Sequence, residues 1–371
     1  MYLLSTDTLK PLNKIYDRED EKRVISGYID MAASIAVTGL RRVGKTTLVR
    51  SLSAVRKNTY TAYFNLWRKK PSCRNFEPEI LDLILDELIK SRGVVGEREY
   101  IKRLEFFGGI VKITREKREH IIERFSIADI IASNNKIILI LDEFQSVSKK
   151  LRDCILRKLV GLKDTYGSYL TIIFTGSVYS LKKFIGGNEE APFYGRLIDE
   201  ILIQPLQPQT AREFLREGLR ELGKDITEDA LDYAIGVLGG FPGWIVNFGL
   251  KSISIRDRID IKAAKKLIKD IEKEALLVLV GEIKRILKQV KNKEIYIKTL
   301  YELGLHGNMG PTRLASMIGR TKSEASRILN FLTMNGLVKN IDGEYIIADP
   351  LLRRVAGRKI FVKEMISIKK Q

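Results

Sequence analysis

The stretch that decides the fold lies near the N-terminus and reads Gly39-Leu40-Arg41-Arg42-Val43-Gly44-Lys45-Thr46-Thr47. It matches the pattern G-x-x-x-x-G-K-[ST], in which main-chain amides turn inward around a chain of phosphates. A short apolar run precedes it and a helical pattern follows, which is the context that this pattern needs. The sequence therefore predicts a phosphate-binding loop between a strand and a helix.

Each residue type in this loop has a physical role. Gly39 and Gly44 can adopt backbone torsions that other residues resist, so successive amides can face one anion. Lys45 would bring a positive charge to the β and γ phosphates, and Thr46 would offer its hydroxyl to Mg²⁺. The helix that begins near Lys45 adds the positive end of its dipole. The expected nucleotide ligands in the loop are Gly39, Arg41, Arg42, Val43, Gly44, Lys45, Thr46 and Thr47.

A second apolar run, residues 136–141, ends in the two carboxylates Asp142 and Glu143. Such an uninterrupted run is typical of a parallel strand buried on both faces. Ligands bind beyond the carboxyl ends of these strands. We expect Asp142 to hold Mg²⁺ and Glu143 to activate the water that attacks the γ-phosphate.

A third apolar run ends in Thr175-Gly176-Ser177. In a parallel sheet the tip of this strand would lie beside Glu143, so Thr175 and Ser177 could orient the γ-phosphate or the water. The alternative is a glycine turn whose hydroxyls face solvent.

Apolar runs alternate with helical segments from about residue 33 to residue 204, which indicates an α/β unit with a parallel sheet. The expected strands are residues 33–38, 59–65, 136–142, 169–175 and 198–204. Residues 74–132 have helical periodicity and clustered charge, and are expected to form helices with a surface insertion.

The composition is that of an ordinary globular protein: 371 residues, 44% hydrophobic and 30% charged. Disordered, collagen-like and coiled-coil chains are thereby excluded, and the length suits two or three domains. No apolar run approaches the roughly 20 residues of a membrane span, and no signal peptide is visible. Cys73 and Cys154 are far apart in the sequence, so neither a disulfide framework nor a metal site is expected. We expect a cytoplasmic protein without a membrane partner.

The net charge of +19 is concentrated toward the C-terminus, since residues 251–371 hold 26 basic and 13 acidic side chains. Such a surplus attracts polyanions such as nucleic acid. A solvated Lys-rich surface and a thermophile composition are the alternatives. Residues 258–291 are expected to form a long amphipathic helix whose apolar stripe is Leu276, Leu277, Val280, Ile283 and Leu287.

Residues 294–350 have the pattern of three helices and a hairpin. Pro311 suits the first position of the second helix, and Thr321 with Glu324 forms a capping box that starts the third. Residues 340–343 would be the hairpin turn. This order resembles a winged helix-turn-helix, in which the third helix enters the major groove, so residues 310–345 are the candidate contact with duplex DNA. The alternative is a module that packs on its own chain or binds a protein.

Together these motifs resemble the archaeal ATPase family, a branch near the AAA+ and signal-transducing NTPases. The resemblance implies that Tyr16 and Arg18 lie beside the adenine, and that Asp142 and Glu143 are the metal and base positions. It also implies that Thr175 and Ser177 end a sensor strand. Arg196 in Phe193-Tyr194-Gly195-Arg196 would be an arginine finger, and Pro242 in Gly239-Gly240-Phe241-Pro242 would pack near the nucleotide.

Two residues of this resemblance leave alternatives open. Arg196 could stabilise charge on the transferring phosphoryl group, or pair with Asp199 or Glu200. AAA+ motors usually start a lid helix with an Arg, whereas this chain has Phe241-Pro242-Gly243-Trp244. That departure favours a nucleotide-dependent switch over a ring-forming motor.

The sequence therefore predicts an α/β P-loop NTPase with a helical lid and a C-terminal winged helix. The expected domains are an ATPase core at 1–204, a lid at 205–275 and a winged-helix domain at 276–371. The expected function is Mg²⁺-dependent binding and hydrolysis of ATP to ADP, coupled to a DNA-binding module, in a chain that could form homo-oligomers. A nucleotide-gated protein-interaction switch is the first alternative, and a small-molecule phosphotransferase is the second.

Overall fold

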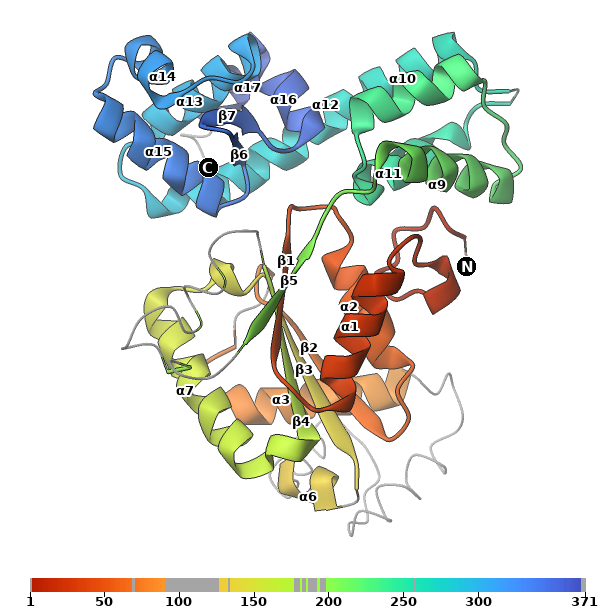
Figure 1. Cartoon of the computed structure of the whole chain (residues 1–371), viewed down its shortest axis with the longest axis vertical. Helices are drawn as coiled ribbons and strands as arrows, with labels where there is room; N and C mark the ends of the chain where they lie inside the picture. The colour runs from red at the N-terminus through yellow and green to blue at the C-terminus, as the bar shows by residue number, and fades with distance from the viewer. Residues whose placement is uncertain are drawn as a thin grey trace.

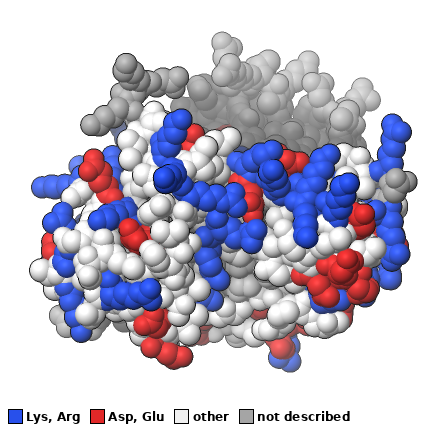
Figure 2. All heavy atoms as spheres, turned by 90° about the horizontal axis from the view of Figure 1, so that it is seen from above, with Lys and Arg blue, Asp and Glu red and all other residues white. Residues whose placement is uncertain are grey.

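The computed structural model describes residues 2–68, 71–90, 127–132, 134–176, 181, 185, 192–193, 198–256 and 258–367. A sheet with its covering helices forms one end of the molecule, and two groups of helices form the other (Figure 1). Seen from that second end, Lys and Arg side chains spread across the surface, while Asp and Glu gather most densely at one side (Figure 2).

Five parallel strands form the sheet in the order β2-β3-β4-β1-β5. Their bounds are β1 (Ile35–Gly39), β2 (Thr59–Asn65), β3 (Lys136–Asp142), β4 (Leu170–Gly176) and β5 (Asp199–Ile203). Every residue of β1 and β4 is buried, as expected for apolar runs covered on both faces. The predicted parallel sheet is confirmed. Its register pairs Thr38 with Gly176 and Asn65 with Asp142, so the loops that follow β1, β3 and β4 lie along one edge.

Helices cover both faces of the sheet (Figure 1). On one face lie α1 (Glu19–Asp30) and α2 (Lys45–Ala54), whose apolar side chains share a core with β1. On the other lie α3 (Phe76–Lys90), α6 (Ile127–Ala132) and α7 (Lys149–Tyr166), which share a second core with the opposite side of β3 and β4. Short 3₁₀ turns complete this part at Leu12–Lys14, Phe144–Ser146 and Gly167–Tyr169.

The structure joins Cys73 and Cys154 in a disulfide, with their Cα atoms 6.1 Å apart. The expectation of no disulfide is therefore wrong. Cys73 lies just before α3 and Cys154 lies on α7, and both helices cover the same face of the sheet. A sequence separation of 81 residues hides this proximity, because only the fold brings the two segments together.

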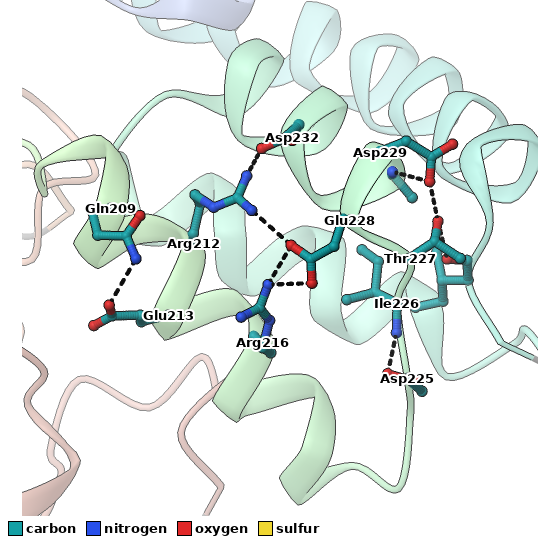
Figure 3. Close-up of polar contacts among 12 residues, drawn as sticks. Gln209, Arg212, Glu213, Arg216, Asp225, Ile226, Thr227, Glu228, Asp229 and Asp232 are labelled. Atoms are coloured by element: carbon teal, nitrogen blue, oxygen red, sulfur yellow. Dashed lines mark hydrogen bonds and ion pairs between the residues drawn. The ribbon is translucent and has the colours of Figure 1, made fainter.

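Above the sheet lies a helical unit, formed by α9 (Pro208–Glu221), α10 (Glu228–Leu238), α11 (Pro242–Ser252) and α12 (Ile261–Ile286). Pro208 and Pro242 open α9 and α11, where proline has no amide to lose. Arg212 and Arg216 of α9 reach Glu228 of α10 at 2.6–2.8 Å, and Arg212 also pairs with Asp232 (Figure 3). These ion pairs bridge α9 and α10 at the surface, while the apolar faces of the two helices share one core.

The long helix α12 is followed by a 3₁₀ turn at Leu287–Gln289 and agrees with the helix predicted over 258–291. Its predicted apolar stripe is wrong at one residue, since Leu277 is 64% exposed. The buried side of α12 instead passes through Ala275 and Leu279 to Val280 and Ile283. Leu277 lies two residues from Ala275 and Leu279, and positions two apart on a helix do not share a face.

The C-terminal unit contains three helices, α13 (Lys293–His306), α14 (Pro311–Ile318) and α15 (Lys322–Met334), followed by β6 (Val338–Ile341) and β7 (Glu344–Ile347). The predicted capping box is present, because Thr321 and Glu324 exchange hydrogen bonds at the start of α15. The predicted hairpin is the antiparallel pair β6–β7. Two further helices, α16 (Pro350–Ala356) and α17 (Lys359–Ile366), had not been predicted.

Residues 2–18, before α1, form an N-terminal arm that lies against the helical unit. Leu4 packs where Gly218 of α9 and Gly249 of α11 leave room, since a Cβ at either glycine would come within 2.3 Å of a Leu4 side-chain atom. The amide of Leu3 donates to Glu221 on α9. These contacts hold the rest of the arm beside the edge of the sheet, where several of its residues line a cavity. None of the helices in the described ranges has the length and apolar character needed to cross a membrane.

Candidate nucleotide-binding site

A cavity of about 430 Å³ opens where the edge of the sheet meets the helical unit and the N-terminal arm. The loop between β1 and α2 forms its floor. Its lining residues are Ser5, Thr6, Asp7, Lys10, Lys14, Ile15, Tyr16, Arg18, Arg41, Arg42, Val43, Gly44, Lys45, Thr46, Thr47, Leu48, Glu143, Leu206, Phe214, Pro242, Gly243, Val246 and Glu282. Most of the loop residues expected to bind nucleotide therefore lie at one cavity.

The loop has the backbone shape that its glycines permit. Gly44 has φ +98° directly before α2 begins at Lys45, a torsion that L side chains rarely adopt. Gly39 does not line the cavity, but a Cβ there would come 2.4 Å from the carbonyl oxygen of Ile203. Gly39 is thus required by close packing against β5, and its carbonyl accepts a hydrogen bond from Lys45.

Lys45 is a buried cation at the floor of the site. Its side chain is folded onto its own loop, where Nζ donates to the carbonyls of Gly39 at 2.9 Å and Leu40 at 2.8 Å. The residue is 5% exposed. Burial lowers the pKa of Lys45, while Glu143 and Asp142 act in the opposite direction. A buried ammonium that has lost its contact with water is stabilised strongly when an anion binds beside it.

Asp142 connects three strands at the end of β3. Its Oδ1 accepts from the Thr46 hydroxyl at 3.0 Å and from the Thr175 hydroxyl, and its Oδ2 accepts from the Tyr63 hydroxyl at 2.7 Å. Burial, with further help from Asp142, raises the pKa of Tyr63, so the phenol stays protonated and donates. Thr46 and Asp142 are therefore adjacent, as the prediction of a shared metal ion requires.

Glu143 follows in a left-handed backbone conformation with φ +57°, which turns its side chain into the cavity. Its Oε2 accepts from Nε2 of Gln145 at 2.7 Å and lies 3.4 Å from Nη2 of Arg41. Burial alone would raise the pKa of this carboxyl, but Arg41, Lys45 and Gln145 outweigh it and lower the pKa. Glu143 is therefore ionised at neutral pH and is held by two neighbours.

The opposite end of the cavity is apolar and aromatic. Tyr16 packs on Phe214 of α9 with ring centroids 5.5 Å apart, and Pro242 and Val246 of α11 complete the wall. Burial and then the nearby acidic residues raise the pKa of Tyr16 to about 12. Arg18 donates to the carbonyl of Gln204 at 2.6 Å, so it fixes the chain between the sheet and the helical unit.

The structure brings Tyr16, Arg18 and Pro242 to the same cavity as the loop, and Thr175 to Asp142. Ser177 and Arg196 lie outside the described residues. Sequence reasoning missed the wall formed by the N-terminal arm, with Lys10 and Lys14, and the contribution of Glu282 from α12. No sequence signal marks these residues, because they reach the cavity only through tertiary packing.

The sequence profile of an ATPase domain predominantly from Archaea matches residues 15–248. The chain belongs to this archaeal ATPase family. The matched range runs from the segment before Tyr16 to α11, and so includes every element that forms the cavity except α12 and the first part of the arm. No curated protein matches the chain significantly.

Solved structures show the same fold as this ATPase family member. A Walker-type ATPase of Pyrococcus abyssi superposes with a TM-score of 0.70 at 22% identity, covering 95% of this chain and 99% of its own. The Orc2 protein of Aeropyrum pernix, solved as ADPNP–ADP complexes, gives 0.60 at 14% identity and covers 98% of each chain. The similarity therefore extends over the full arrangement of sheet, helical unit and C-terminal unit.

Proposed function

We propose that the protein binds ATP with Mg²⁺ in this cavity, hydrolyses it to ADP, and uses the bound nucleotide to position a lid and a DNA-binding winged helix. The observation that carries the proposal is the convergence of Lys45, Thr46 and Glu143 on one end of the cavity, with Asp142 hydrogen-bonded to Thr46 beside them. Membership of the ATPase family supports the nucleotide, and the Orc2 structure with ADPNP and ADP supports ATP over GTP.

The residues present suit Mg²⁺. A hydroxyl and a carboxylate, Thr46 and Asp142, lie 3.0 Å apart, and Mg²⁺ prefers few protein oxygens supplemented by phosphates and water. Within the described ranges no cluster of three His, Cys, Asp or Glu side chains could hold a metal, which agrees with a metal that arrives with the nucleotide. When bound, the ion would neutralise charge on the β and γ phosphates.

Glu143 is the group that we propose as the base. Its contacts with Arg41 and Gln145 keep its carboxylate ionised, and both are made to Oε2. We propose that the other oxygen, Oε1, accepts the proton of the attacking water. A very slow turnover would instead support the alternative of a nucleotide-gated protein-interaction switch.

The experiment that tests ATP and metal binding is a titration of the purified protein with ATP, with Mg²⁺ or with excess EDTA. Phosphate release is followed in parallel. We expect binding that weakens without metal, since Thr46 and Asp142 would then lack their ion, and release of phosphate only with metal. A rate of phosphate release that is equal in EDTA and in Mg²⁺ would contradict the metal assignment. A protein that does not bind ATP at millimolar concentration would contradict the proposed function itself.

Two predicted catalytic residues remain proposals. We assign Ser177 to orient the γ-phosphate, because it follows two residues after Thr175, which contacts Asp142. Arg196 would act as an arginine finger, within one chain or between copies in a homo-oligomer. An Arg196→Ala variant that hydrolyses ATP at the wild-type rate would exclude the finger.

For the remainder of the chain we propose residues 205–275 as the lid and residues 276–371 as the winged-helix domain. The three helices and hairpin of the C-terminal unit support the second assignment. On α15, Lys322 and Arg327 are not buried, whereas Ala325 and Ile328 are, so the outward face is basic. Helix α15 lies at the end of the molecule on which Lys and Arg spread in Figure 2.

For duplex binding we expect affinity to fall steeply with salt, because each neutralised phosphate contributes a slope of about −0.9 in log K against log salt. Replacing Lys322 and Arg327 together with glutamine should therefore reduce the slope by about 2. The matched control replaces Lys262 and Lys266 of α12, neither of which is buried, and should leave more of the slope intact. The measurement is fluorescence anisotropy of a labelled duplex, with and without ATP.

Two outcomes would decide against this surface. An unchanged slope in the α15 variant would move the DNA contact elsewhere. A wild-type protein that does not bind duplex even at low salt would favour the protein-interaction switch.

A further inference from the structure

Arg42 lies in the phosphate loop, yet its guanidinium contacts residues of the helical unit and the C-terminal unit. It stacks over the Trp244 ring of α11 with its Cζ 4.3 Å from the ring centroid. Its Nη2 pairs with Glu282 of α12 at 2.7 Å, and its Nη1 lies 3.5 Å from Asp349, which precedes α16. One loop residue therefore contacts three segments that are distant from it in the sequence.

The partners of Arg42 are themselves locked together. The Trp244 indole N–H donates to Oδ2 of Asp349 at 2.9 Å. Oδ1 of Asp349 accepts from the amides of Leu351 and Leu352 and so caps α16. Trp244 and Asp349 are both buried, where a charged hydrogen bond is stronger than in water. Arg42, Trp244, Glu282 and Asp349 thus form one network, which we call the Arg42 network.

The backbone of Arg42 is held as firmly as its side chain. Its φ is +66°, a conformation that a non-glycine residue keeps only when its surroundings impose it. Its carbonyl accepts the Gly243 amide at 3.0 Å. A Cβ on Gly243 would come 2.8 Å from the Arg42 Cβ, so α11 touches the loop directly. The loop's shape therefore depends on contacts made by the helical and C-terminal units.

We propose that Glu282 and Asp349 are positioning residues for the phosphate loop, which act through Arg42 and couple nucleotide affinity to the placement of the C-terminal unit. The inference rests on the proposed binding of ATP in the cavity. Arg42 was expected to be a nucleotide ligand, and the network gives it a different role, because its side chain ties the loop to α12 and α16. Coupling of this kind is reciprocal, so bound nucleotide must also stabilise the start of α16.

The direction in which ATP affinity changes in a Glu282 variant distinguishes a positioning role from a direct effect of the Glu282 charge on the nucleotide. Glu282 also lines the cavity, and a carboxylate there repels a triphosphate. Glu282→Gln would therefore tighten ATP binding if Glu282 acted only through its own charge. If Glu282 positions the loop through Arg42, the same variant frees Arg42 and weakens ATP binding, by about five- to twentyfold on the scale of measured coupling between sites.

The test measures ATP affinity by calorimetry for Glu282→Gln, Arg42→Ala and the double variant. The matched control is Glu274→Gln, which removes another α12 carboxylate that pairs with Lys251 of α11 and not with the loop. We expect weaker binding in each Arg42-network variant, no further loss in the double variant, and wild-type affinity in the control. Unfolding temperatures without nucleotide identify any variant whose fold has failed.

A second readout follows the coupling in the opposite direction. Amide exchange at Leu351 and Leu352 should slow when ATP binds to the wild type and should not respond in Arg42→Ala. Wild-type affinity or tighter binding in Glu282→Gln, or an unchanged exchange response in Arg42→Ala, would overturn the proposal while leaving ATP binding established. A wild type that binds no ATP would instead overturn the proposed function.

Discussion

Replacing Lys45 with alanine is expected to reduce ATP affinity by about two to three orders of magnitude. Lys45 is a buried cation at the floor of the cavity, and its Nζ is satisfied only by the carbonyls of Gly39 and Leu40 within the described contacts. A pair of opposite charges 4 Å apart contributes about 4 kcal/mol at an effective dielectric constant of 20, which is nearly three factors of ten in binding. Calorimetric titration with ATP and Mg²⁺ measures the loss.

The chain offers a matched control for this variant. Lys163 on α7 is another lysine whose Nζ donates to backbone carbonyls, those of Gly167 at 2.6 Å and Leu170 at 2.7 Å, and burial lowers its pKa as well. It lies at the opposite edge of the sheet from the cavity, because its Nζ also donates to the carbonyl of Ala32 before β1, and Leu170 is the first residue of β4. Lys163→Ala should lose stability but keep ATP affinity. If Lys45→Ala bound ATP as tightly as this control, the phosphate end of the cavity would be wrongly assigned.

Replacing Glu143 with glutamine is expected to leave ATP bound while lowering the rate of hydrolysis by about 10²- to 10⁴-fold, the usual contribution of a general base. Glutamine keeps the shape of the side chain but cannot accept the proton of the water. Loss of the charge also removes the attraction to Arg41 and Lys45, so ATP affinity should stay equal or rise. Single-turnover phosphate release measures the rate, and Glu77→Gln, an α3 carboxylate that pairs with Lys158, is the control.

The pH profile gives an independent check on Glu143. Its pKa is lowered by Arg41, Lys45 and Gln145 against the opposing effect of burial, so the carboxylate stays ionised throughout the neutral range. Loss of activity through protonation of Glu143 should therefore begin only at a pH below the ordinary glutamate pKa of about 4.3. A Glu143→Gln variant with wild-type turnover, or a wild-type rate that already falls between about pH 8 and pH 6 in step with a single carboxyl group, would assign the base elsewhere.

The sequence was sufficient where the physical cause is local. The run before Asp142 is apolar at every position that the sheet buries, and the Thr321–Glu324 capping box is a contact between residues three apart. The sequence was not sufficient where the cause is a tertiary contact. Cys73 and Cys154 meet only because α3 and α7 share a face, and Leu277 is exposed because the buried side of α12 passes through Ala275 and Leu279, each two residues away. Arg42 matched a phosphate-loop pattern, and nothing local shows that Glu282 and Asp349 would engage it.

Helix α12 has a consequence for how the cavity could open. Its 26 residues pack against α10 and α11 of the helical unit and against α16 and α17 of the C-terminal unit, in one continuous apolar core. A straight helix of that length is stiff over about 39 Å. Helix α12 therefore holds the helical unit and the C-terminal unit together. The chain reaches these units from β5 through the short connection at residues 204–207. We expect an opening of the cavity wide enough to release a product to move both units as one rigid body about that connection.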